Sequence, residues 1–149
     1  MFQIRILLLA ALMGLGLVGA AQSAPAVSGP VPTEVVVDVS EQTMAVYING
    51  SLFDVWPVST ARPGKITPRG KWSPNFLSKH HKSSRYNNAP MPFSIFYNGN
   101  FAIHGTNQIS KLGSTASAGC VRLATENAEV LFNRVQKYGL KSFRVTVID

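Results

Sequence analysis

The sequence predicts a mostly β domain with one late helix. Short runs rich in β-branched and aromatic residues recur between residues 34 and 104, and such runs are typical of strands. Asn-Gly pairs at residues 49–50 and 98–99 separate apolar runs and predict two β-hairpins. Residues 125–138 place apolar side chains at helical spacing. At 149 residues and 46% hydrophobic content, the chain has room for one domain with a real core.

Two segments precede the expected domain, which covers residues 33–149. Residues 1–23 have the pattern of a secretory signal peptide, with Arg5 before an apolar run and small residues near its end. A membrane anchor is the alternative, but an anchor needs about 20 apolar residues and this run is shorter. Residues 24–32 are rich in Pro and lack a period, so we expect an extended tether there.

The first expected strands form a three-stranded meander. Residues 34–39 and 42–48 are rich in β-branched side chains, and residues 52–59 follow the first Asn-Gly pair. Residues 59–72 contain several Pro and Gly residues, so they predict a loop that leads into a short strand near Trp72.

The second half is expected to add a long loop, a hairpin, the helix and a closing strand. Residues 73–90 are polar and predict the loop, and long loops in compact domains are commonly functional. Strands are expected at residues 91–97 and 101–104, on either side of the second Asn-Gly pair. Thr125 is placed to cap the helix, and residues 143–148 alternate as a final strand.

The charge balance is basic. Without the signal peptide the chain keeps 13 Lys and Arg against 7 Asp and Glu, which favours anionic partners such as cell-wall polymer or lipid. No nucleic-acid-binding motif accompanies this charge, so nucleic acid is not an expected partner. Seven basic residues lie between residues 62 and 85, either as a rim for an anionic polymer or as ordinary solvated loop charges. They are Arg62, Lys65, Arg69, Lys71, Lys79, Lys82 and Arg85.

Cys120 is the only cysteine, so an exported chain leaves it without a disulfide partner. It follows Gly119 at what reads as the mouth of the late helix, while His104 ends an expected strand. A thiol attacks as thiolate and needs a base. We expect Cys120 to be a nucleophile, His104 its base, and the N–H groups of Gly119 and Cys120 an oxyanion hole. The alternative is a buried structural thiol beside a structural histidine.

Four other positions are considered for a role in binding, and each also has a purely structural interpretation. Arg122 is placed to bind a substrate carboxylate with its planar guanidinium, or to form a structural ion pair or carbonyl clamp. Tyr86 is either a phenol over the substrate or a packed aromatic. His80 and His81 are adjacent and therefore point in different directions, so no metal site is expected there.

Two segments resemble the active-site signature of the L,D-transpeptidase (YkuD-type) catalytic domain family. They are His-Gly-Thr-Asn at residues 104–107 and Ser-Ala-Gly-Cys-Val-Arg at residues 117–122. Thr-Pro-Arg-Gly-Lys-Trp at residues 67–72 and Met-Pro-Phe at residues 91–93 also resemble this family, so the likeness runs from about residue 34 to residue 149. Ala118 departs from the pattern, because many members have His or Pro there.

The resemblance implies a β-sandwich-like fold with a mixed sheet and one or two short helices. It also implies that the carbonyl of Gly105 orients His104, with Asn107 as the alternative partner, and that Ser117, Thr106 and Asn107 lie on the substrate side. The implied substrate is the peptidoglycan stem peptide, cleaved between the L-centre of its third residue, commonly meso-diaminopimelate, and D-Ala. The resulting thioester passes to an amine of another stem, giving a 3→3 cross-link, or to a protein amine or to water.

Three functions follow from these expectations. The first is an L,D-transpeptidase that needs no cofactor, acts as a monomer in the periplasm or cell wall of a bacterium, and contributes to peptidoglycan biosynthesis and cell shape. The second is an L,D-carboxypeptidase of the same fold, in which water replaces the amine acceptor. The third is a non-catalytic basic module that binds the cell wall.

Overall fold

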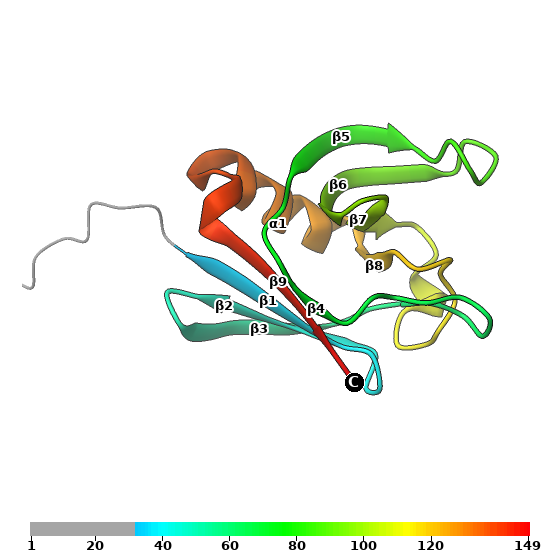
Figure 1. Ribbon diagram of the computed structural model, residues 1–149, viewed down its shortest axis with the longest axis horizontal. Helices are drawn as coiled ribbons and strands as arrows, with labels where there is room; N and C mark the ends of the chain where they lie inside the picture. The colour runs from blue at the N-terminus through cyan, green and yellow to red at the C-terminus, as the bar shows by residue number, and fades with distance from the viewer. Residues whose placement is uncertain (1–31) are drawn as a thin grey trace, which may run out of the picture.

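The computed structural model describes residues 32–149, which fold into two sheets and one long helix (Figure 1). The expected signal peptide and almost all of the expected tether lie outside the described residues. Within the described part of the chain, no helix combines the length and apolar character needed to span a bilayer.

The first sheet, sheet A, contains the predicted meander and the closing strand. Its strands, in spatial order, are β3 (Ser51–Pro57), β2 (Thr43–Ile48), β1 (Thr33–Asp38), β9 (Phe143–Ile148) and β4 (Gly70–Trp72). β1, β2 and β3 pair antiparallel, whereas β1 and β9 pair parallel. The last strand of the chain therefore lies inside the sheet, between β1 and the edge strand β4.

The second sheet, sheet B, carries the second predicted hairpin. Its order is β5 (Phe76–Lys82), β6 (Pro90–Asn98), β7 (Phe101–Thr106) and β8 (Val121–Ala124). β5, β6 and β7 pair antiparallel, and β7 and β8 pair parallel. The prediction of one long loop over residues 73–90 is wrong, because β5 occupies its centre. β5 is an edge strand that pairs with β6 through its backbone, so its polar composition does not prevent it from forming.

Helix α1 (Thr125–Tyr138) packs against sheet B and is followed by Gly139. Its buried side chains are Ala128, Leu131, Phe132 and Val135. The prediction of a capping Thr125 is wrong: the residue before the helix is Ala124, and the Thr125 hydroxyl instead donates to the carbonyl of Thr106 at 3.3 Å. Two single-turn 3₁₀ helices, η1 (Ile109–Lys111) and η2 (Leu140–Ser142), complete the structure.

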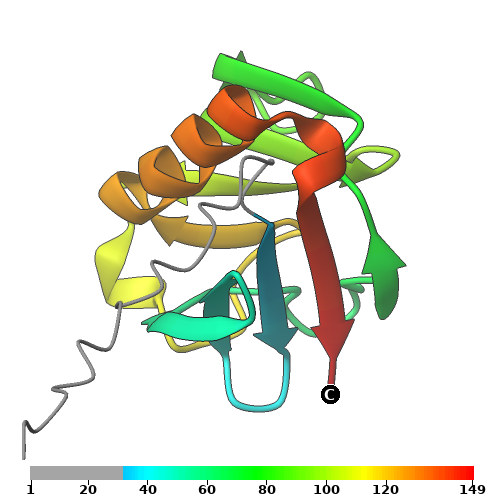
Figure 2. The same cartoon turned by 90° about the vertical axis from the view of Figure 1, so that its left-hand side faces the viewer.

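The core lies between the two sheets and under α1. In Figures 1 and 2, sheet A forms the lower part of the molecule and sheet B, with α1, the upper part. Val35 and Val37 from β1 meet Ile103 and Val121 from sheet B in this core, and all four are fully buried. Burial of each such side chain stabilises the fold by about 1.5–3 kcal/mol. The predicted fold class, mostly β with mixed sheets and one helix, is confirmed.

Candidate active site

The parallel pairing of β7 with β8 brings His104 and Cys120 to one face of sheet B. His104 lies opposite Arg122, and Cys120 comes two residues before Arg122. Cys120 comes just before β8 and packs against a cluster that includes Ala102, which lies two residues before His104 on β7. Side chains alternate along a strand, so Ala102 and His104 point to the same side of sheet B. Ile103 and Val121 point the other way, into the core. The two candidate catalytic side chains therefore lie on the same side of sheet B.

His104 is held in one orientation by its neighbour. The side chain is 5% exposed, and its Nδ1 lies 2.8 Å from the carbonyl oxygen of Gly105. With the Nδ1 proton donated to that carbonyl, Nε2 is left free to accept a proton. Burial lowers the pKa of His104 to about 4; the Gly105 hydrogen bond opposes this change, and electrostatic interactions with Arg122 and His81 add to it. The imidazole is neutral at pH 7.

Cys120 is partly buried against Met91, Phe96 and Ala102. Burial raises the pKa of its thiol, while a backbone hydrogen bond from Ala102 and the charge of Arg122 act in the opposite direction. The thiol lies 3.8 Å from the carbonyl oxygen of Asn100. Burial therefore favours the uncharged form of both candidate groups, the Cys120 thiol and the His104 imidazole.

The sequence suggested that Cys120 lies at the N-terminus of the helix, but the structure does not place it there. The whole of β8 separates it from α1, which begins at Thr125. The electrostatic effect of a helix terminus fades within about one turn. Arg122 and the Ala102 backbone are therefore the groups that stabilise the thiolate here, and the helix N-terminus is not one of them.

The loop before Cys120 is fixed by two hydroxyl groups. Ser117 Oγ donates to the Cys120 carbonyl at 2.6 Å and accepts from the Gly119 N–H at 3.0 Å. Thr67 Oγ1 donates to the Gly119 carbonyl at 2.9 Å. Ser117 and Thr67 have no exposed surface, so they position the loop and do not face a substrate. The Gly119 N–H, expected in the oxyanion hole, is occupied by Ser117 in this structure.

The backbone conformation and the surroundings of Gly119 allow only glycine at this position. Its φ of +133° is rarely adopted by other residues, and a Cβ there would lie 2.6 Å from the Phe101 ring and 2.7 Å from the Ile66 carbonyl oxygen. The absence of a side chain lets the nucleophile loop pass between these two groups. The sequence marks Thr67 only as part of a family-like segment, because its contact with Gly119 spans 52 residues and no local pattern reveals it.

The residues after His104 form a local turn. A Cβ on Gly105 would lie 2.9 Å from the Cα of Thr125, so a glycine is needed where β7 meets the start of α1. Thr106 Oγ1 accepts from the N–H of Gln108 at 3.1 Å. Asn107 is exposed, and the Nδ1 of His104 is already bound to Gly105, so Asn107 is not the orienting partner in this structure.

Arg122 lies directly across from His104 and is half-buried. Its guanidinium donates to the side-chain oxygen of Gln108 at 3.3 Å. Burial lowers its pKa. Among residues 32–149 the one ion pair joins Arg69 to Asp149, so Arg122 has no carboxylate partner there. Its side-chain contact is the hydrogen bond to the Gln108 amide. A guanidinium in this position can accept a substrate carboxylate.

Tyr86 and the adjacent histidines lie near the site on the β5–β6 hairpin. Tyr86 is 45% exposed and lines a cavity of about 380 Å³ that also contacts Ala118. His81 packs its ring edge-on against Phe96, with ring centres 4.9 Å apart, while His80 is exposed. Residues 32–149 contain no group of three or more His, Cys, Asp or Glu arranged to hold a metal ion.

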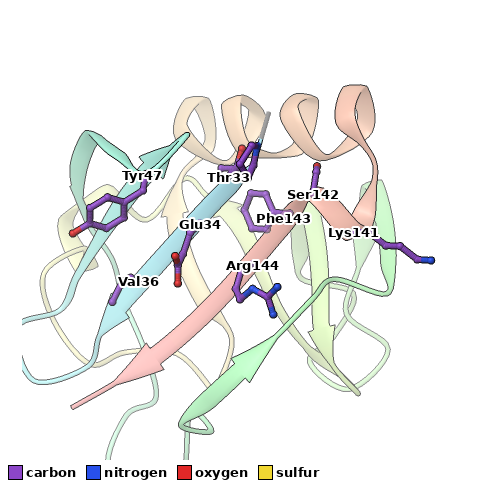
Figure 3. Close-up of a pocket in the computed structure, with 10 residues that line it drawn as sticks. Thr33, Glu34, Val36, Tyr47, Lys141, Ser142, Phe143 and Arg144 are labelled. Atoms are coloured by element: carbon purple, nitrogen blue, oxygen red, sulfur yellow. The ribbon is translucent and has the colours of Figure 1, made fainter. Parts of the chain in front are cut away.

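A larger cavity, of about 470 Å³, lies on sheet A. Figure 3 shows its side chains, with Glu34 of β1 and Arg144 of β9 on neighbouring strands and Tyr47 to one side. None of the candidate catalytic residues lines it. The larger of these two cavities therefore contains neither Cys120 nor His104.

The family is shown by comparison with known proteins. The family model for the L,D-transpeptidase catalytic domain (YkuD) matches residues 32–147. The chain belongs to this family. The L,D-transpeptidase homologue YkuD of Bacillus licheniformis is 30% identical over 124 residues, covering 78% of this chain and 69% of the relative. ErfK/SrfK of Escherichia coli, a homologue of the same type, is 26% identical over 139 residues, covering 77% of this chain but only 44% of the relative.

Solved structures of this family have the same fold. An L,D-transpeptidase from Mycobacterium smegmatis superposes with a TM-score of 0.71 at 18% identity, covering 80% of this chain and 59% of the other. An L,D-transpeptidase from Stackebrandtia nassauensis gives a TM-score of 0.68 at 25% identity, covering 86% and 59%. The chain thus spans a little over half of each of these L,D-transpeptidases.

Proposed function

We propose that this L,D-transpeptidase family member cross-links peptidoglycan stem peptides through the thiol of Cys120. The family supports an acyltransferase of this type, and the proposal adds the nucleophile, the base and the substrate. The observation that supports it is the β7–β8 pairing, in which His104 lies opposite Arg122, together with the packing of Cys120 against a cluster that includes Ala102 of β7. The Nδ1 contact of His104 with Gly105 leaves the other ring nitrogen available as a base.

The reaction begins when His104 accepts the proton of the Cys120 thiol as the sulfur attacks. The attacked carbonyl belongs to the L-centre of the third stem residue, meso-diaminopimelate, and is bonded to D-Ala. Backbone N–H groups near Cys120 stabilise the negative oxygen that forms. As the C–N bond breaks, His104 returns its proton to the leaving amine of D-Ala, and a thioester remains on Cys120.

An amine of a second stem peptide then attacks the thioester. His104 takes a proton from this amine and passes it to the departing sulfur, which restores the thiol. The product is a 3→3 cross-link. A protein amine in place of the second stem would give protein attachment, and water would give a tripeptide, the product of an L,D-carboxypeptidase.

The neutral resting pair fits this order of events. Because the pKa of His104 is about 4 and that of the Cys120 thiol is raised, an ion pair is unfavourable before substrate binds. Charge develops only during attack, when Arg122 and the Ala102 backbone can stabilise the thiolate. The proposal also includes export to the periplasm or cell wall and action as a monomer, as the sequence predicts.

The test is incubation of the purified protein with tetrapeptide muropeptides, with products resolved by mass spectrometry. We expect a dimer that has lost one D-Ala. The Cys120→Ala variant should lose at least roughly 10,000-fold in rate, as expected for removal of a nucleophile. Thr115→Ala, an exposed change in the same loop, is the matched control and should keep the activity.

Each outcome separates the three functions. A tripeptide without dimers identifies an L,D-carboxypeptidase. Unchanged muropeptides together with binding to whole sacculi identify a non-catalytic wall-binding module. Dimer formation by a correctly folded Cys120→Ala protein, with an unchanged circular dichroism spectrum, would remove Cys120 from the mechanism.

A further inference from the structure

The cavity of about 380 Å³ next to the nucleophile loop has a distinct composition. Its lining includes Lys65, Ile66, Arg85, Tyr86, Phe101 and Ala118. Ala118 lies two residues before Cys120, and the Phe101 ring contacts the place where a Cβ of Gly119 would be. The cavity therefore adjoins the loop that leads to Cys120, although Cys120 and His104 do not line it.

One wall of this cavity is the tip of the β5–β6 hairpin, which is internally fixed. The buried hydroxyl of Ser83 accepts hydrogen bonds from the N–H groups of Arg85 at 3.3 Å and Tyr86 at 3.1 Å. The Ser83 N–H in turn donates to the carbonyl of Ala89 at 3.0 Å, which closes the tip. Arg85 and Tyr86 are thus presented from an ordered backbone.

A second segment of the lining carries Lys65 and is tied to the nucleophile loop. The N–H of Lys65 donates to the Arg62 carbonyl at 3.0 Å, and the N–H of Arg62 donates to the Ser117 carbonyl at 2.9 Å. On the other side of Lys65, Thr67 binds the Gly119 carbonyl. Lys65 is therefore held between two backbone connections to the segment that ends in Cys120.

The structure separates the basic residues between residues 62 and 85 into groups. Lys65 and Arg85 both line the cavity. Arg69 is paired with Asp149, and the Nζ of Lys79 lies over the Phe93 ring, 5.6 Å from its centre. Within the described residues the cavity lining contains no acidic side chain. Two cations that converge without a counter-charge favour an anionic group, and a carboxylate suits the planar guanidinium of arginine.

The rest of the lining suits the aliphatic part of a peptide. Ile66 is 66% exposed and Tyr86 45% exposed, so both offer apolar surface to a ligand. Ala118 adds only a methyl group at the inner end, which leaves space there. A side chain with a short aliphatic stem and a terminal carboxylate matches this combination of space, apolar wall and positive charge.

We propose that this cavity is a carboxylate subsite that holds the free side-chain carboxylate of diaminopimelate in a stem peptide. The inference rests on the proposed function and adds a specificity to it. Lys65 and Arg85 select stems with a free carboxylate over stems in which that carboxylate is amidated, because amidation removes the negative charge and leaves the ammonium of the same diaminopimelate centre as a net positive charge near the two cations.

The test compares two tetrapeptide muropeptides that differ only in amidation of the diaminopimelate side chain. In the wild type we expect kcat/KM to be about tenfold higher for the free acid, the size given by two partly solvated charge contacts. In the double variant Lys65→Gln/Arg85→Gln this ratio should fall to about two or less. The matched control is Lys141→Gln/Arg144→Gln, which removes the same charge at the remote cavity (Figure 3) and should keep the wild-type ratio.

A binding experiment separates this inference from the proposed reaction. Calorimetry on the Cys120→Ala protein measures the affinity for both peptides without turnover, with and without the two Gln substitutions. A preference for the free acid that disappears with Lys65→Gln/Arg85→Gln supports the subsite even if no product forms in the activity assay. Normal dimer formation with equal affinity and equal kcat/KM for the two peptides would overturn the subsite and leave the proposed function intact. An equal decrease of the kcat/KM ratio in both double variants would also overturn the subsite, because the preference would then depend on the net charge of the protein.

Discussion

Sheet A and sheet B differ in where their irregularities lie, and the candidate catalytic residues belong to sheet B. In sheet A the register shift lies at the edge, between Val46 and Tyr47 of β2 where it pairs with β3, while β1 and β9 keep one register over six residue pairs. In sheet B, the β6–β7 register shifts between Phe96 and Asn98, and Phe93 within β6 has a positive φ of 54°. Such irregularities change which way side chains point. The central pairing of sheet A is therefore regular, whereas the irregular pairing of sheet B lies in β6 and β7, next to His104, the candidate base.

Gly119→Ala tests the functional side of this comparison most strongly. The new Cβ would meet the Phe101 ring and the Ile66 carbonyl, so the nucleophile loop has to move. We expect transpeptidation to fall by about 100-fold or more, since small displacements of reacting groups have effects of that size. Gly113→Ala is the control, because Gly113 also has a positive φ but a Cβ there meets nothing within 4 Å. Similar rate losses in both variants would show that backbone strain alone is responsible.

The pH dependence of stability tests whether the buried histidine of sheet B is neutral. The pKa of His104 is about 4 in the folded protein, below the ordinary value of 6.5. Between these values the unfolded chain binds a proton that the folded protein does not, so the free energy of unfolding should decrease as the pH falls from 6.5 to 4. The decrease is about 3 kcal/mol at the lower end.

Denaturant titrations at several pH values measure this decrease. His104→Gln should remove most of it, while His80→Gln, at an exposed position of β5, should retain it. A wild-type stability that stays constant over this pH range would show that His104 titrates normally and that its burial does not control its charge.

Val37→Ala tests the supporting side of the comparison and has the smallest expected effect. Val37 is fully buried in the core, so its truncation should lower the free energy of unfolding by about 2 kcal/mol. The kcat measured well below the unfolding temperature should stay unchanged. Val36→Ala, on the opposite face of the same strand and half-buried, should have less than half the effect on stability. A large loss of kcat in Val37→Ala would show that sheet A does more than support the fold.

The accuracy of the sequence predictions follows the strength of local patterns. The meander, both Asn-Gly hairpins and α1 were predicted because their residues act on near neighbours in the chain. β5 was missed because an edge strand is held by backbone hydrogen bonds to β6, which its polar side chains do not reveal. The prediction that Cys120 lies at the N-terminus of the helix was wrong because β8, which separates them, was not recognised. β8 is only four residues long and lies between two stronger sequence patterns.

The sequence by itself determined the chemical groups of the site: one thiol, one histidine in the second hairpin, an arginine two residues beyond the thiol and a family-like pattern around them. The expected strand end at His104 was wrong, because β7 continues to Thr106 through its pairing with β8. The tertiary structure decided the arrangement of these groups, through the parallel β7–β8 register, and it decided which basic residues line the cavity next to Ala118. The physical reason is that backbone hydrogen bonds between strands are nearly independent of side-chain identity. The partner and register of a strand therefore depend on how the whole chain packs.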